Sequence, residues 1–187
     1  MTKVEPITRQ LYLVRHTDYN GSTSHISDAG RKAVPAAMTN LKSDLYDRLN
    51  PQFTNAAKQP NLHNIFVGAS EVRRGMESAE EFVLQFRDPL FFIDGPLAMP
   101  GLAIDLPKEN FVRELQRMPN TCPTAVCFSH EHEIAQMVMH LAGKKVIIQL
   151  PERLSHLSIV ALEYKGNWAD IDREKATFLK YIEGPRI

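Results

Sequence analysis

Residues 11–17 read LYLVRHT, an apolar run that ends abruptly in a cation and an imidazole. A short apolar run bounded by polar residues is typical of a β-strand that is covered on both faces. In open α/β sheets, ligands bind just beyond the carboxyl ends of such strands. Arg15 offers a planar fork to phosphate oxygens, and His16 offers a nitrogen that can attack phosphorus or accept a proton. The alternative interpretation is a strand that simply ends in two solvated polar residues.

The rest of the chain alternates short apolar runs with segments of helical periodicity. Such alternation predicts an α/β fold, a three-layer sandwich with a mostly parallel central sheet flanked by helices. With 187 residues, of which 43% are hydrophobic and 24% charged, the chain is expected to form a single domain over 1–187. Strands are predicted at 11–14, 63–67, 89–93, 124–128, 146–150, 158–164 and around Trp168, and helices at 29–41, from about 70 to 86, at 109–118 and from 134 to Gly143.

Proline, glycine and asparagine mark the expected helix ends and loops. Ser27 or Asp28 is expected to cap the first helix, and Pro35 to kink that helix or shorten its first turn. Residues 50–61 are predicted to form a surface loop. We expect substrate specificity to depend on the loops at 21–26, 50–61 and 98–106.

Charge and composition exclude several classes of function. Lysine and arginine together number 22, as do aspartate and glutamate, so no basic field favours nucleic acid or a membrane surface. No apolar stretch is long enough to cross a bilayer, and the N-terminus does not resemble a secretory signal. Cys122 and Cys127 are too few for a disulfide framework or a structural zinc site. We therefore expect a soluble, reduced, cytoplasmic protein that captures any anionic ligand locally.

Two adjacent arginines follow the second predicted strand. Residues 70–79 read SEVRRGMESA and place Arg73 and Arg74 in the first turn of a helix, where they oppose the positive end of its dipole. A phosphate bound there would be stabilised by the guanidinium groups and the free helix N–H groups together. A solvated arginine pair is the alternative. Because each follows a predicted strand, three polar segments are expected to converge at one edge of the sheet: 15–16, 70–74 and 129–130.

Four motifs, in this order, resemble those of the histidine phosphatase superfamily, whose members have the phosphoglycerate mutase-like fold. Arg15-His16-Thr17 resembles the family's Arg-His-Gly signature, with Thr17 in the glycine position. Residues 26–30 resemble the opening of the family's first helix. The segment 70–79 resembles a family segment in which Arg74 takes the arginine position, and 129–131 resemble the late Ser-His element. The short chain is most similar to the small SixA-like phosphohistidine phosphatases.

The resemblance implies a phosphatase that works through a covalent phosphohistidine on His16. His16 would attack phosphorus in its neutral form, and Arg15, Arg74 and His130 would bind the phosphoryl oxygens. His130 would thereby also belong to the catalytic set. The expected substrate is a phosphorylated small molecule or a phosphoprotein, and no cofactor is expected.

A proton donor for the leaving group is harder to assign. Mutase-like members of the family place a glutamate after the strand that follows the second helix, and residues 95–99 contain none. Glu131 resembles the proton donor of the acid-phosphatase branch, so it is predicted to be the general acid. Alternatively, Glu131 is only a favourable charge in a first helical turn. Asp94 and Asp105 are the other nearby carboxylates.

Several alternatives stay open. A broad-specificity phosphomonoesterase or a mutase-like enzyme would use the same residues, and a catalytically silent relative would only bind a phosphorylated ligand. Residues 130–133 contain two histidines and two glutamates, but residues two apart on a helix face different ways, so no metal site is predicted. His156 is a candidate to line the same pocket, whereas Ser70 is interpreted as a helix cap. The other histidines are expected to be structural or solvated: His25, His63 and His140.

Overall fold

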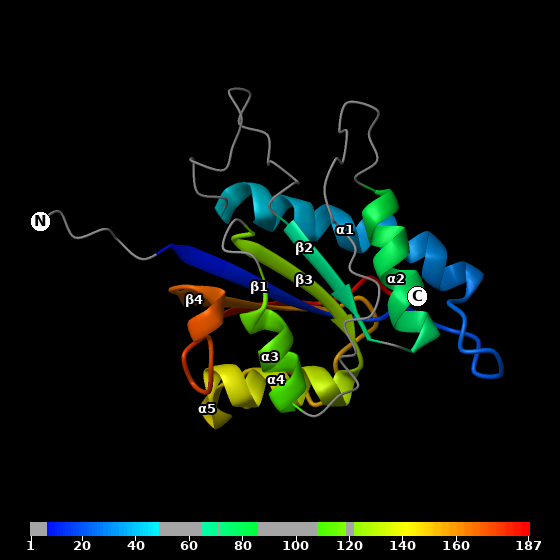
Figure 1. Ribbon diagram of the computed structural model, residues 1–187. Helices are drawn as coiled ribbons and strands as arrows, with labels where there is room; N and C mark the ends of the chain where they lie inside the picture. Colours follow the sequence, from blue (N-terminus) through cyan, green and yellow to red (C-terminus); the bar gives the residue numbers. More distant parts are fainter. Residues whose placement is uncertain (1–6, 49–64, 71, 86–107, 119–121) are drawn as a thin grey trace, which may run out of the picture.

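The structure is a computed structural model that describes residues 7–48, 65–70, 72–85, 108–118 and 122–187 (Figure 1). Strands and helices alternate through the first two thirds of the chain, as the sequence pattern predicts. In chain order the elements are β1 (Thr8–Arg15), α1 (Asp28–Arg48), β2 (Ile65–Ala69), α2 (Arg73–Leu84), α3 (Lys108–Gln116), β3 (Thr124–Ser129), α4 (Glu131–Ala142), α5 (Lys144–Ile147), β4 (Ile159–Lys165), the 3₁₀ helix η3 (Trp168–Asp170) and β5 (Thr177–Ile182).

The five strands form one sheet in the order β2-β3-β1-β4-β5. The pairings β2–β3 and β3–β1 are parallel, whereas β1–β4 and β4–β5 are antiparallel. The sheet is therefore mixed, and the prediction of a mostly parallel sheet is wrong. The reason lies after α4, where the chain returns to the carboxyl edge of β1 before β4 starts. A strand that starts at that edge must run antiparallel to β1.

Helices cover both faces of the sheet, which makes the three predicted layers (Figure 1). In β1, Tyr12 and Val14 face the side covered by α1 and α2, while Leu11 and Leu13 face the side covered by α3 and α4. All four side chains are buried. Burial on both faces explains why β1 is an almost continuous apolar run rather than an alternating one.

Helix α1 is longer than the predicted 29–41. Ser27 caps it, because the Ser27 hydroxyl accepts a hydrogen bond from the backbone N–H of Gly30 at 2.9 Å. The helix continues through Pro35 to Arg48. Near its end, the buried carboxylate of Asp44 accepts from the Tyr12 hydroxyl of β1 at 2.8 Å and pairs with Lys180 of β5. These polar contacts extend the helix beyond its apolar stripe. No helix within the described ranges has both the length and the apolar character to span a bilayer.

The C-terminal third differs most from the prediction. The apolar run at 146–150 was predicted as a strand, but it begins in helix α5, and Ile148 is 87% exposed. The segment around Trp168 is a 3₁₀ helix whose buried indole donates to the Cys122 carbonyl, rather than a strand. Strand β5 was not predicted. Short apolar runs do not distinguish a strand from a helix by periodicity alone. The predicted strand 89–93 and the predicted loops 50–61 and 98–106 lie outside the described residues.

Candidate active site

His16 follows directly after β1 and lies beside the end of β3. Its backbone N–H donates to the Ser129 carbonyl at 2.9 Å, because Arg15 and Ser129 are in register across the parallel pair. The next residue after Ser129 is His130, so the two imidazoles meet at the carboxyl edge of the sheet. Their ring centroids are 4.8 Å apart, with an angle of 66° between the planes. This convergence of two strand exits is the one predicted from the sequence.

The His16 ring is buried and has a defined tautomer. Only 4% of the residue is exposed. Its Nδ1 lies 2.7 Å from the Thr17 carbonyl oxygen, to which it must donate. Its Nε2 lies 3.1 Å from Nε of Arg74. A guanidinium can only donate, so Nε2 is the unprotonated nitrogen with its lone pair turned toward Arg74.

The same surroundings keep His16 neutral. Burial, against the opposing effect of the Thr17 carbonyl and together with the neighbouring His130, Arg74 and His156, lowers the pKa of His16 to about 3. Arg74 and the other imidazoles favour the uncharged ring because a second positive charge there would be repelled. His16 is therefore a neutral imidazole near pH 7, the form that can act as a nucleophile.

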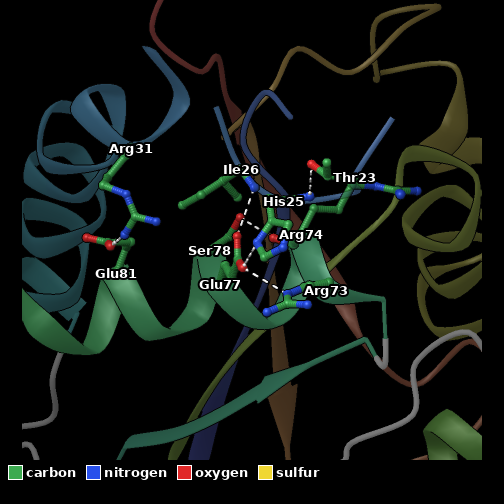
Figure 2. Close-up of polar contacts among 9 residues, drawn as sticks. All are labelled: Thr23, His25, Ile26, Arg31, Arg73, Arg74, Glu77, Ser78 and Glu81. Carbon is green, nitrogen blue, oxygen red and sulfur yellow. Dashed lines mark hydrogen bonds and ion pairs between the residues drawn. The ribbon is translucent and has the colours of Figure 1, made fainter. Parts of the chain in front are cut away.

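Arg74 is held in place by contacts within its own helix and with the residues that follow β1. The Ser78 hydroxyl, one turn further along α2, donates to the Arg74 carbonyl at 2.6 Å (Figure 2). That hydroxyl also accepts from the backbone N–H of Thr17 at 3.1 Å. On the other side, the guanidinium carbon of Arg74 lies 4.5 Å from the centre of the Tyr19 ring. Ser78 thus couples the first turn of α2 to the residue beside His16.

Ser70 contacts the site as well as the start of α2, because its hydroxyl also accepts from the backbone N–H of Val72 at 3.3 Å. Its hydroxyl is 3.1 Å from Nε2 of His130, and its backbone N–H donates to the Phe128 carbonyl of β3 at 2.9 Å. The residue at the N-cap position of α2 is Val72. A Cβ on Gly75 would lie 2.6 Å from the Ser70 hydroxyl, so only glycine permits this approach. The interpretation of Ser70 as a cap missed its contact with His130, although its place at the end of β2 was a signal.

Arg15 and Glu131 form an ion pair that reaches the start of β4. Nη1 of Arg15 is 3.3 Å from Oε2 of Glu131. Oε1 of Glu131 accepts from the backbone N–H of Leu154 at 3.1 Å, and Arg15 donates to the Leu154 carbonyl. One oxygen of Glu131 is therefore paired with a cation and the other accepts a backbone hydrogen bond. In this arrangement, Glu131 connects Arg15 to the segment that precedes β4.

His156 reaches the same edge from that segment. The backbone N–H of Arg15 donates to the Ser158 carbonyl and the N–H of Leu157 donates to the Arg15 carbonyl, each at 3.0 Å. These bonds place the His156 ring 5.5 Å from the His16 ring. Burial lowers the pKa of His156, as do Arg15 and Arg74, while Asp18 and Glu131 raise it. Leu157 has φ of 58°, a left-handed conformation that costs about 1–2 kcal/mol outside glycine.

The structure describes only some of the other residues that the sequence analysis discussed. Asp94, Asp105 and His63 lie outside the described residues. His132 contacts Gln136 on the same helix at 2.6 Å. Over the part of the chain that the structure describes, no group of three His, Cys, Asp or Glu side chains is arranged to hold a metal ion.

The chemistry of this edge is that of a site for a tetrahedral oxyanion. It combines one unprotonated imidazole nitrogen with a guanidinium and two further imidazoles around it. Guanidinium and imidazole N–H groups donate to phosphoryl oxygens, and their positive potential stabilises the charge that spreads over these oxygens during transfer. The arrangement provides a nucleophile and an anion-binding shell at one place.

Comparisons with known proteins identify related folds but not a family. No protein-family model and no curated protein matches the chain. A structure of a protein named phosphohistidine phosphatase SixA from Nakamurella multipartitia is 15% identical and has a TM-score of 0.60, covering 97% of this chain and 99% of its own. A protein histidine phosphatase SixA complexed with tungstate is 14% identical, with a TM-score of 0.62 and coverages of 93% and 96%. A mycobacterial glucosyl-3-phosphoglycerate phosphatase is 15% identical, with a TM-score of 0.51 and coverages of 91% and 97%. At these identities, the likeness shows a shared fold.

Proposed function

We propose that the protein is a phosphatase of the histidine phosphatase superfamily in which Nε2 of His16 takes up the phosphoryl group. One observation carries the proposal: Arg74 donates to Nε2 of a buried imidazole whose Nδ1 donates to the Thr17 carbonyl. These contacts make Nε2 the unprotonated nitrogen, and its lone pair becomes free to attack when the Arg74 N–H turns to a phosphoryl oxygen. The motifs around His16, Arg74 and His130, and the fold shared with SixA phosphatases along nearly the whole chain, support the assignment.

The proposed reaction has two steps. In the first, the lone pair of Nε2 attacks phosphorus in line, the Nε2–P bond forms, and the bond from phosphorus to the leaving group breaks with its electron pair. In the second, water attacks phosphorus, the Nε2–P bond breaks, and phosphate leaves while His16 returns to its neutral form. Arg74, Arg15 and His130 stabilise the charge on the equatorial oxygens in both steps.

Phosphohistidine is the proposed substrate. An ester needs a proton on its departing oxygen, whereas the P–N bond of a phosphoramidate is easier to cleave. One oxygen of Glu131 is paired with Arg15 and the other accepts from the Leu154 N–H, which suits Glu131 to positioning rather than to proton donation. If Glu131 serves in positioning, the substrate that least requires a proton donor is favoured. The SixA neighbours are phosphohistidine phosphatases by name, which agrees with this choice.

A small-molecule phosphate ester is the second candidate. It is favoured by the fold shared with a glucosyl-3-phosphoglycerate phosphatase. A substrate panel separates the two: a phosphohistidine peptide, a phosphotyrosine peptide, an aryl phosphate and a phosphoglycerate, compared by kcat/KM. We expect the phosphohistidine peptide to have the highest kcat/KM. A phosphoglycerate that exceeds it would assign the protein to the second candidate.

The proposal as a whole is tested by His16→Ala. We expect turnover of every substrate in the panel to fall by about 10⁴-fold or more, because the nucleophile is lost. Wild-type protein quenched in mid-turnover should carry an acid-labile phosphoryl group on His16. His132→Ala is the matched control, since that imidazole is exposed and contacts Gln136. Turnover that persists in His16→Ala with an intact fold would contradict the proposal.

A further inference from the structure

Tyr19 touches both of the groups that would hold a phosphoryl group. Its ring centroid lies 5.5 Å from that of His16, with the planes at 76°. The guanidinium carbon of Arg74 lies 4.5 Å from the same ring. The residue is nonetheless 36% exposed. Tyr19 therefore lies beside the His16 ring and Arg74, with part of its aromatic side chain exposed.

The turn that carries Tyr19 is held closed by backbone hydrogen bonds. Tyr19 and Ile26 form an antiparallel bridge, and the N–H of Asn20 donates to the His25 carbonyl at 2.8 Å. The N–H of Ser27 donates to the Asp18 carbonyl at 3.0 Å. The Ser27 hydroxyl also donates to the Asp18 carboxylate at 2.6 Å. The segment is thus an ordered turn rather than a loosely attached loop.

Glu77 ties this turn to the helix that carries Arg74 (Figure 2). Its Oε2 accepts from the backbone N–H of Ile26 at 2.8 Å, and its Oε1 lies 2.6 Å from Nδ1 of His25. Arg73 donates to the same Oε1 at 3.2 Å. Burial raises the pKa of Glu77, but the Ile26 N–H, His25 and Arg73 together hold that pKa below its ordinary value. A charged Glu77 therefore sets the distance between the Tyr19 turn and the first turn of α2.

We infer that Tyr19 is a specificity-determining residue that favours substrates with a planar imidazole or aryl leaving group over those with an aliphatic one. The inference rests on the proposed function and deepens it. In-line attack puts the leaving group across phosphorus from Nε2, and the exposed part of the Tyr19 ring, beside Arg74, is available to contact that group. Aromatic rings gain from edge-to-face or offset contact beyond the area they bury, and this gain corresponds to about 3- to 10-fold in affinity. An aliphatic chain lacks that gain.

Tyr19→Leu tests the inference, with Tyr19→Phe as the variant that keeps the ring. The measured quantity is the ratio of kcat/KM for phosphoimidazole or 4-nitrophenyl phosphate to kcat/KM for glycerol phosphate. Comparing variants by this ratio cancels the intrinsic reactivity of each substrate. We expect Tyr19→Leu to lower the ratio about 3- to 10-fold and Tyr19→Phe to leave it unchanged. An equal fall for all substrates would overturn the inference and leave Tyr19 with the sole part of holding Arg74.

A binding experiment separates this inference from the proposed function. Phenylphosphonate and methylphosphonate carry the same anionic group and are not hydrolysed, so their dissociation constants need no turnover. Tyr19→Leu is expected to weaken phenylphosphonate about 3- to 10-fold and methylphosphonate by less than 2-fold. Equal weakening of both would overturn the inference. If the wild type hydrolyses nothing in the panel, the proposed function fails, and this comparison still decides whether Tyr19 recognises planar groups.

Glu77 is a positioning residue in this scheme, and Glu81 provides its matched control. Glu77→Gln removes the charge that holds the turn, and it should lower the aryl-to-glycerol ratio in the same direction as Tyr19→Leu. Glu81 lies one turn further along α2 and pairs with Arg31 of α1, away from the turn that carries Tyr19 (Figure 2). Glu81→Gln makes the same chemical change and should leave the ratio unchanged. A ratio that responds equally to Glu77→Gln and Glu81→Gln would contradict positioning through the turn.

Discussion

The parallel and antiparallel halves of the sheet contribute to the site in opposite ways. Strands β1, β2 and β3 are parallel and deliver their site residues after their carboxyl ends: His16, Ser70 and His130. Strand β4 is antiparallel to β1, so the residues that precede it lie at the same edge. His156 reaches the site in this way. The rule that ligands bind at the carboxyl ends of strands therefore finds only the parallel half of this site.

The two halves also differ in how firmly they hold their side chains. In the parallel half, hydrogen bonds join His16 to Thr17, Arg74 to His16, and His130 to Ser70. His156 has a ring contact with His16 and, among the described residues, no side-chain hydrogen bond. We therefore expect the parallel half to dominate catalysis and the antiparallel half to adjust it.

The largest effect of a binding residue is expected for Arg74→Ala. Its guanidinium is the cation that contacts Nε2, so kcat/KM should fall by about 10²- to 10³-fold on every substrate. Arg74→Lys should recover only part of that loss, because an ammonium lacks the planar fork. Steady-state kinetics on the phosphohistidine peptide checks this. If Arg74→Ala lowered kcat/KM less than His156→Asn does, the parallel half would not dominate catalysis.

Stability is also expected to depend on pH, and the largest contribution should come from His16 in the parallel half. Burial lowers the pKa of His16 to about 3, so the folded protein keeps the ring neutral while the unfolded chain takes up a proton below about 6.5. The unfolded state then binds more protons, and stability falls as the pH drops from 6.5 toward 3. Between pH 7.5 and 4.5, the wild type should lose about 2–3 kcal/mol more than His16→Gln.

Urea unfolding at the two pH values measures this difference. Compared with His156→Gln, the wild type should also lose more stability at the lower pH, but by a smaller amount. The pKa of His156 is also lowered, but its ring is only half-buried. An equal loss of stability in wild type and His16→Gln would show that the fold does not keep His16 neutral.

His156→Asn tests the contribution of the antiparallel half to catalysis. The ring faces His16 at 5.5 Å, so it is placed to donate one hydrogen bond to a phosphoryl oxygen. Removing one such bond should lower kcat/KM about 10-fold. The measurement is the same kinetic panel, with His140→Asn as the control, since His140 lies near the other end of α4 beside Asp172. No change in kcat/KM would leave the antiparallel half without a part in catalysis.

The smallest effect is expected at the ion pair that joins the halves. Glu131→Gln weakens a partly exposed contact with Arg15, so kcat/KM should fall about 2- to 5-fold, equally for an aryl phosphate and a phosphohistidine peptide. A fall for the ester that clearly exceeds the fall for phosphohistidine would instead assign Glu131 as the proton donor, as its sequence position predicts.

Much of the parallel half could be predicted because its information is local. Each of the apolar runs of β1, β2 and β3 is followed by a segment of helical periodicity, and each polar segment follows a strand directly. The partners of these side chains could not be predicted in the same way. Ser70 lies 60 residues from His130, and the Tyr19 turn lies more than 50 residues from Glu77. Such contacts depend on how distant elements pack, which periodicity does not encode.

The sequence by itself determined the alternation of strands and helices, the burial of β1 on both faces, and the exit of His16, Arg74 and His130 toward one edge. The tertiary structure alone decided the direction of β4 and the tautomer of His16. Strand direction depends on the path by which the chain returns, and the apolar run at 158–164 is compatible with either direction. The tautomer depends on which groups face each ring nitrogen, here the Thr17 carbonyl and the Arg74 guanidinium. Those groups meet only after the sheet and α2 have packed together.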